Sequence, residues 1–174
     1  LLTRRGAKTV FAVTAGFQDL LEIGEQDRPN LFELTIRKTR PLYHSVIEIP
    51  ERVAADGAVL RPIDITATTA ALRQAKSSGA ESIAICLLHS FRNDIHERAV
   101  AAIAHDVGFA EVSLSSVVSP LIKIVPRAET TVLDAYLNPV IRSYADEILR
   151  RLSAGSRLQL MTSHGGLVSR DRFT

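Results

Sequence analysis

Two histidines, a serine and a glutamate gather in one short stretch, residues 89–97. His89 and Ser90 follow a run of apolar residues, and His96 and Glu97 come seven positions after them. Imidazole and carboxylate groups relay protons, and both are ligands for metal ions. The stretch therefore supplies His89, Ser90, His96 and Glu97 as candidate catalytic residues of a proton relay or a metal site.

A local structural interpretation of the same stretch stays open. Asp94 and Glu97 have the spacing of a capping box at the start of a helix, and His89 could bond the loop backbone. A separation of seven residues between His89 and His96, across a turn, is not a known ligand spacing.

The second candidate is a glycine pair, Gly165-Gly166, which follows an expected strand at residues 157–162. Such pairs let the backbone approach a phosphate closely, so we take Gly165 and Gly166 as candidate cofactor-binding residues, although most such pairs are turns. The sequence contains neither a G-x-x-x-x-G-K-[ST] loop nor a G-x-G-x-x-G loop. Cys86 lies inside an apolar run and is expected to be an inert core thiol.

The elements that must position these residues alternate between strands and helices. We expect strands at residues 8–14, 45–49, 81–88 and 111–114, helices at 66–78, 94–107 and 130–152, and a hairpin turn at Asp56-Gly57. Thr66 is the expected N-cap of the first helix, and Pro139 either kinks the last helix or starts a new one. The pattern predicts an α/β fold with a mixed, largely parallel sheet, flanking helices and a long C-terminal helix. Sites in such sheets form beyond the carboxyl ends of the strands, where His89 and Ser90 would lie.

Composition narrows the class of protein. The 174 residues are 46% hydrophobic and 23% charged, which fits one globular domain or slightly more. A net charge of +2 gives no case for nucleic acid, and no apolar run approaches the roughly 20 residues of a membrane helix. One cysteine excludes an internal disulfide and suits a reducing compartment. Because the sequence starts without Met and ends soon after the glycine pair, we expect an interior fragment of a longer protein.

Five stretches together resemble the hydantoinase A/5-oxoprolinase family, which includes N-methylhydantoinases and acetone carboxylase subunits of the beta type. They run in order along nearly the whole chain, at residues 14–31, 49–57, 87–97, 112–140 and 161–167. In the last of them, Thr162 and His164 depart from the Gln-Ser-Asn-Gly-Gly segment of the family.

The resemblance implies an actin-like, sugar-kinase-like ATPase fold and an enzyme that opens cyclic amides such as hydantoins or 5-oxoproline. ATP is expected to phosphorylate the amide carbonyl oxygen, with Mg as its metal, in the cytoplasm. The phosphate-binding loops of the family would lie outside this chain, so we expect the chain alone to be inactive. The implied partners are a small cyclic amide and a hydantoinase B-type subunit or domain, in an oligomer without nucleic acid or membrane.

The resemblance also divides the chain. Residues 1–115 would form an N-terminal-type α/β region, and residues 116–174 would begin the catalytic region. Arg127 is a further candidate for anion binding, against a salt bridge to Glu129 or a contact at the helix start. Two other functions stay open, namely an ATP-dependent acetone or acetophenone carboxylase subunit and a non-catalytic α/β binding or assembly module.

Overall fold

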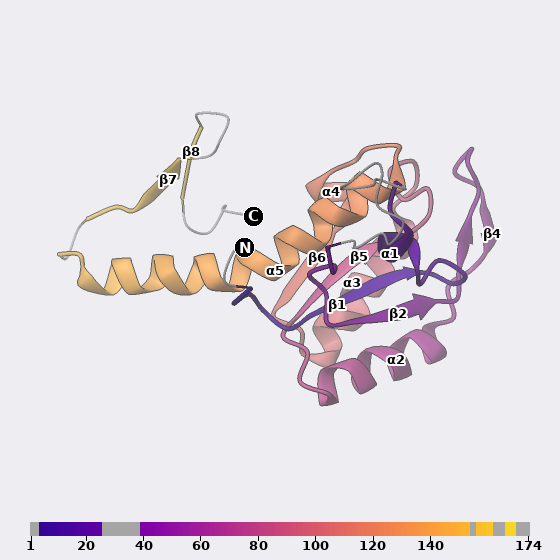
Figure 1. Ribbon diagram of the computed structural model, residues 1–174, viewed down its shortest axis with the longest axis horizontal. Helices are drawn as coiled ribbons and strands as arrows, with labels where there is room; N and C mark the ends of the chain where they lie inside the picture. The colour runs from indigo at the N-terminus through magenta and orange to yellow at the C-terminus, as the bar shows by residue number, and fades with distance from the viewer. Residues whose placement is uncertain (1–3, 26–38, 154–155, 162–165, 170–174) are drawn as a thin grey trace, which may run out of the picture.

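A four-stranded parallel sheet lies at the centre of the computed structural model, which describes residues 4–25, 39–153, 156–161 and 166–169. The strand order is β2-β1-β5-β6, and every neighbouring pair is parallel (Figure 1). The strands are β1 (Thr9–Thr14), β2 (Ser45–Ile49), β5 (Ser82–Cys86) and β6 (Glu111–Leu114). The predicted α/β class and largely parallel sheet are confirmed, and the predicted bounds of β2 and β6 are those observed.

Both faces of the sheet are covered, which explains why its central strands are apolar at nearly every position. Val10 and Ala12 of β1 pack against helices α2 (Ile65–Ser77) and α3 (Ile95–Val107). Phe11 and Val13 point to the opposite face, against helix α5 (Ile124–Arg151) and the short helix α1 (Leu20–Ile23). The chain thus forms three layers, with α2 and α3 on one side of the sheet and α5 on the other (Figure 1).

One predicted helix cap is wrong, and one expected capping box is absent. Helix α2 begins at Ile65, because the carboxylate of Asp64, and not Thr66, caps it by accepting from the Ala67 amide at 2.9 Å. Helix α3 begins after Asp94, whose side chain makes no capping bond, and the carboxylate of Glu97 bonds elsewhere. The expected capping box is absent because buried donors from other segments take the Glu97 oxygens.

A hairpin connects β2 to α2. Strands β3 (Arg52–Val53) and β4 (Val59–Arg61) pair antiparallel, as the Asp56-Gly57 turn predicts. Asp56 Oδ1 accepts from the Ala58 amide at 2.9 Å, and Gly57 has a φ of +94°. That left-handed backbone conformation suits glycine and explains the residue at this position.

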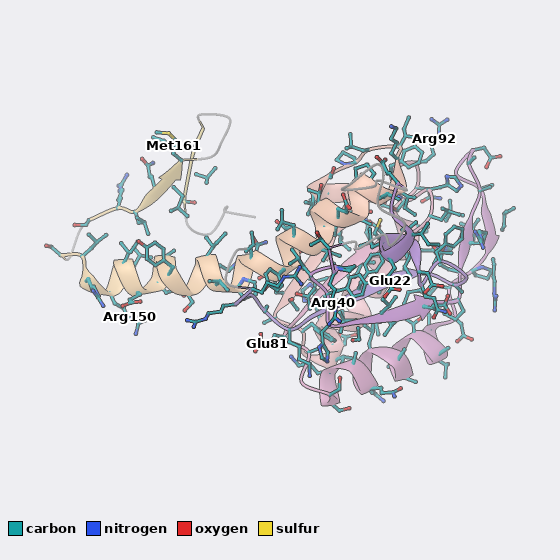
Figure 2. All side chains as sticks on the ribbon, viewed as in Figure 1. Glu22, Arg40, Glu81, Arg92, Arg150 and Met161 are labelled. Carbon is teal, nitrogen blue, oxygen red and sulfur yellow. The ribbon has the colours of Figure 1, made fainter. Side chains whose placement is uncertain are left out.

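Helix α5 begins at Ile124, six positions before the expected start, and continues through Pro139 as one helix. Of the two alternatives for Pro139, a new helix is therefore excluded. The helix leaves the sheet in its C-terminal half, and a hairpin of β7 (Gln159–Met161) and β8 (Leu167–Ser169) follows beyond its end (Figures 1 and 2). Among the described residues, no helix has the length and apolar character that crossing a membrane requires.

Candidate functional site

The carboxyl ends of β1 and β5 meet at a reversal in the path of the chain. From β1 the chain reaches β2 through α1 and Leu42, which pack on the α5 face. From β5 it reaches β6 through α3, on the opposite face. Ligands of open parallel sheets bind in the crevice at such a reversal. The predicted site stretch begins here, because Leu87 directly follows β5.

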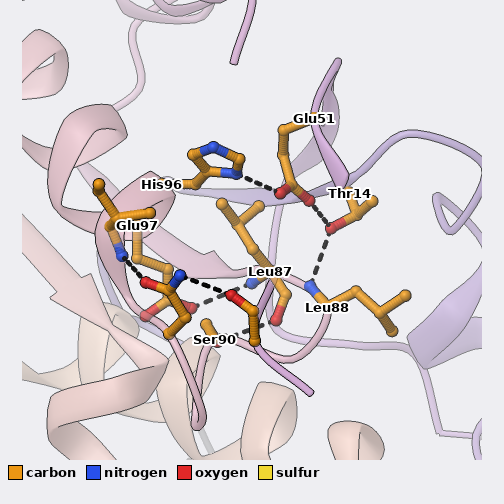
Figure 3. Close-up of polar contacts among 10 residues, drawn as sticks. Thr14, Glu51, Leu87, Leu88, Ser90, His96 and Glu97 are labelled. Carbon is orange, nitrogen blue, oxygen red and sulfur yellow. Dashed lines mark hydrogen bonds and ion pairs between the residues drawn. The ribbon is translucent and has the colours of Figure 1, made fainter. Parts of the chain in front are cut away.

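A buried chain of hydrogen bonds ties the ends of these two strands together (Figure 3). The Leu88 amide donates to Thr14 Oγ1 at 2.8 Å, and this hydroxyl donates to Glu51 Oε1 at 2.5 Å. The second oxygen of Glu51, Oε2, lies 2.6 Å from Nδ1 of His96. All three polar side chains are buried, so an imidazole and a carboxylate face each other away from bulk water.

Glu97 anchors a second buried network on the neighbouring strand ends. Its Oε1 accepts from the Leu87 amide at 3.0 Å and from Ser115 Oγ at 2.6 Å. Its Oε2 accepts from the Ser116 amide at 2.9 Å, and the Glu97 side chain is fully buried. Ser115 directly follows β6, so one carboxylate joins the carboxyl ends of β5 and β6.

The hydroxyl of Ser90 also belongs to this network, and it is engaged with other protein groups. Its Oγ donates to the Leu87 carbonyl at 2.9 Å and lies 3.1 Å from Ser115 Oγ, and the residue is buried. The hydroxyl therefore stabilises the turn after β5. Of the four predicted catalytic residues, Ser90 and Glu97 share one network, whereas His96 pairs with Glu51.

His89 stands at the tip of the turn in an unusual backbone conformation. It is half-buried, and its φ of +59° lies in the left-handed region. Its carbonyl accepts from the amides of Arg92 and Asn93 at 2.9 and 3.2 Å, and its ring meets the ring of Phe91 edge to face. Non-glycine residues in this region are uncommon and cluster at functional sites, and histidine is among the types enriched there.

Arg127 supports the same turn from the α5 side. Its guanidinium is fully buried, and Nη2 donates to the Leu87 carbonyl at 2.8 Å. Nη1 donates to the Leu121 carbonyl at 3.3 Å, and the group lies 5.4 Å from the ring centre of Phe91. Its described partners are carbonyl oxygens and a ring, and the alternative salt bridge to Glu129 is not formed.

The thiol of Cys86, at the end of β5, is buried beside these groups. Burial raises its pKa above the ordinary value, and this effect exceeds the opposing influence of the nearby Arg127 guanidinium. A protonated, inaccessible thiol is a poor nucleophile, which agrees with the expected inert role.

The other candidate residues lie elsewhere. Gly165 is outside the described residues, and Gly166 directly precedes β8. Strand β8 lies near the C-terminal half of α5, away from the carboxyl ends of the sheet (Figure 1). The structure thus does not bring Gly166 to the histidines, and its role in binding a cofactor stays a prediction.

The residues present do not fit ATP or its metal. The sequence lacks both glycine-rich phosphate loops, and Arg127 is bonded to backbone carbonyls. In the part of the chain that the structure describes, no three histidine, cysteine or acidic side chains gather where they could hold a metal ion.

Comparison with known families decides the affiliation of the chain. The sequence model of the hydantoinase/oxoprolinase N-terminal region matches residues 1–108, and that of hydantoinase/oxoprolinase matches residues 127–174. The chain belongs to the hydantoinase/oxoprolinase family. The resemblance inferred from the five stretches is thereby confirmed.

Named members of the hydantoinase/oxoprolinase family align along nearly the whole chain. The 5-oxoprolinase of Saccharomyces cerevisiae is 41% identical over 202 residues, which cover 99% of this chain and 16% of the yeast protein. Caprolactamase subunit alpha of Pseudomonas jessenii is 30% identical over 175 residues, which cover 96% of this chain and 25% of that subunit. The chain therefore spans between about one sixth and one quarter of these relatives.

Two solved structures share the fold. The ATP-dependent caprolactamase from Pseudomonas jessenii has a TM-score of 0.79 and 28% identity, over 95% of this chain and 25% of that chain. The nucleotide-free acetone carboxylase has a TM-score of 0.77 and 26% identity, over 97% of this chain and 26% of that chain. The sheet and the helix α5 thus belong to an architecture that enzymes of this family use.

Sequence reasoning missed three side chains of the buried networks, those of Ser115, Glu51 and Thr14. Ser115 directly follows β6. Glu51 stands between β2 and β3, and Thr14 ends β1, so neither adjoins the 89–97 stretch in sequence. The predicted sheet could have pointed to Thr14 and Glu51, because both residues lie at the carboxyl ends of strands that the pattern predicts to be parallel.

Proposed function

We propose that this chain is part of an ATP-dependent cyclic-amide hydrolase that opens 5-oxoproline or hydantoin rings. The observation that carries the proposal is the alignment with yeast 5-oxoprolinase, at 41% identity over 99% of the chain. A relative whose name denotes the opening of a different lactam, caprolactamase subunit alpha, supports the wider class of cyclic amides.

The proposed site lies at the carboxyl ends of β1 and β5. His89 and His96 are the proposed residues nearest to the substrate, since His89 stands half-exposed at the tip of the turn. Ser90 and Glu97 belong to the same site but hold its shape, because their polar atoms bind the backbone and serine hydroxyls. Replacing His89 by alanine in the complete polypeptide should slow ring opening, and unchanged turnover would remove His89 from the site.

The chain alone should neither bind nor hydrolyse ATP. The absence of either phosphate loop from the sequence supports this expectation. Titration calorimetry with MgATP on this chain should show no binding heat. A saturable ATP signal would contradict the expectation and would direct attention to the Gly165-Gly166 segment.

In the complete protein, ATP with Mg and a hydantoinase B-type partner subunit would supply what this chain lacks. The name of the Pseudomonas relative, a subunit alpha, supports an assembly of several subunits. A cytoplasmic location and an oligomeric state belong to the same proposal. Co-purification of a tagged complete polypeptide with the product of a neighbouring reading frame would test the partnership.

A ketone carboxylase subunit is the second candidate, favoured by the structural match to acetone carboxylase at a TM-score of 0.77. Water attacks the amide in the hydrolase reaction, whereas bicarbonate supplies the carboxyl group in the carboxylase reaction. The two activities are therefore distinguished by their products. The complete polypeptide, with its partner, should release ADP with 5-oxoproline, hydantoin or caprolactam and yield the ring-opened acid. ADP release only with acetone or acetophenone plus bicarbonate would establish the carboxylase instead, and no ADP with any substrate would favour a binding module.

A further inference from the structure

Glu51 and His96 form a pair whose geometry is that of a carboxylate holding an imidazole. The Nδ1–Oε2 distance is 2.6 Å, and the two side chains are 7% and 0% exposed. Glu51 stands before the β3–β4 hairpin, and His96 lies in the first turn of α3, so the pair joins two separate elements. The structure thus pairs His96 with Glu51 and not with its sequence neighbour Glu97.

Glu51 is itself held in one orientation. Its other oxygen, Oε1, accepts from Thr14 Oγ1, whose hydroxyl in turn accepts from the Leu88 amide. A carboxylate fixed at both oxygens presents one oxygen to the imidazole at a constant angle. The Thr14 hydroxyl has one proton, and the Leu88 amide is itself a donor, so that proton points to Glu51 and the direction of the whole chain is set.

The other ring nitrogen of His96, Nε2, lies on the side of the ring away from Glu51 (Figure 3). It makes no hydrogen bond with another described residue, so its lone pair is not taken up by the described part of the chain. The His96 side chain is 7% exposed. An imidazole that donates from Nδ1 to a carboxylate offers the lone pair of Nε2 as a base.

We propose that Glu51 is a positioning residue that keeps the proton of neutral His96 on Nδ1, so that Nε2 acts as the general base of ring opening. This inference rests on the proposed function. The water oxygen bonds to the carbonyl carbon while the C=O π electron pair moves onto the carbonyl oxygen and one water proton passes to Nε2. That oxygen pair then re-forms the C=O bond as the leaving group departs. The ring C–N bond then breaks, its electron pair goes to the nitrogen, and the proton moves from Nε2 to that nitrogen, which leaves His96 neutral again.

The tautomer of His96 is measured by long-range 1H–15N NMR on this chain at a pH where the ring is neutral. The His96 signals are assigned by their loss in His96→Gln, with His105→Gln, an exposed position on the same helix, as the matched control. The proton should reside on Nδ1 in the native chain, and its share on Nδ1 should fall in Glu51→Gln. A native His96 protonated on Nε2 would overturn the proposal.

The second test measures kcat and KM for variants of the complete polypeptide, with its partner and ATP. His96→Ala should lower kcat by about 100- to 10,000-fold, and added imidazole should restore part of it. Glu51→Gln should lower kcat by about 10- to 1,000-fold with KM nearly unchanged, since the general base is retained but misoriented. Glu129→Gln, an exposed carboxylate on α5, should leave both values within about twofold, as surface substitutions usually do.

Thermal melting of each variant shows whether a lower kcat comes from loss of the general base or from loss of folded protein. The proposal is contradicted if folded Glu51→Gln retains full kcat, if kcat falls only in proportion to the unfolded fraction, or if imidazole restores nothing to folded His96→Ala. If the wild-type polypeptide opens no cyclic amide, the proposed function fails, whereas the tautomer measurement still decides whether Glu51 positions His96.

Discussion

His96 Nδ1 lies 2.6 Å from Glu51 Oε2, and this contact fastens the start of α3 to the segment between β2 and β3. The contact closes a buried path from the Leu88 amide through Thr14 to the imidazole. Glutamate is almost never fully buried unless it is paired, so the contact with His96 helps to explain the burial of Glu51.

Replacing Thr14 by valine should destabilise the chain although the shape is preserved. The substitution leaves the buried Leu88 amide without an acceptor and Glu51 Oε1 without a donor. We expect a loss of about 1–3 kcal/mol in the free energy of unfolding, measured by urea denaturation. Thr130→Val on the exposed side of α5, where the hydroxyl donates to the Pro126 carbonyl of the same helix, should change the same quantity by less than about 0.5 kcal/mol. Equal effects of the two variants would contradict the role of Thr14.

Replacing Glu97 by glutamine should also destabilise the fold. Three donors converge on the carboxylate, so the amide group of glutamine would turn a donor toward another donor. Bonds to a charged acceptor contribute about 1.5–3 kcal/mol, and we expect a loss in that range by the same denaturation assay. An unchanged midpoint in Glu97→Gln would show that the carboxylate does not hold the ends of β5 and β6 together.

Arg127 should not tolerate lysine. The guanidinium reaches two carbonyls, of Leu87 and Leu121, from a fully buried position, and an ammonium group cannot reproduce this planar arrangement. Arg127→Lys should lower the unfolding free energy by about 2–4 kcal/mol, as changes at buried charged groups commonly do. Arg142→Lys, which alters a partly exposed ion pair with Glu111, is the matched control with an expected loss of less than about 1 kcal/mol.

Cys86 should resist thiol reagents in the native chain. Burial raises its pKa, so the thiolate that reacts is scarce near pH 8, and the side chain is inaccessible. Ellman's reagent should modify the thiol only after denaturant is added. The favoured protonated form contributes stability below the ordinary thiol pKa of roughly 8.5, and that contribution is lost as the pH rises through the higher folded-state pKa. Rapid modification of the native chain would contradict this burial.

The sheet could be predicted because its information is local. The apolar runs at 8–14 and 81–88 have the composition of strands buried on both faces. The Asp56-Gly57 pair likewise marks the separate β3–β4 hairpin directly. The N-cap of α2 was misplaced because Asp64 and Thr66 are both good caps, and only the path of the chain after Pro62 decides between them.

The candidate site was only partly predictable for a physical reason. The local motif places His89, Ser90, His96 and Glu97 together, but the partners of a buried carboxylate are chosen in three dimensions. Glu97 reaches the segment after β6 and His96 reaches Glu51, across 18 and 45 residues respectively. No spacing rule relates such positions, since strand order, and not sequence distance, makes them neighbours.

The most direct test of the proposed site is a structure of the complete polypeptide with 5-oxoproline bound. The ring should lie at the carboxyl ends of β1 and β5, with its amide group within reach of His89 and of Nε2 of His96. A ring bound elsewhere, with both histidines remote from it, would contradict the assignment of the site to this edge of the sheet.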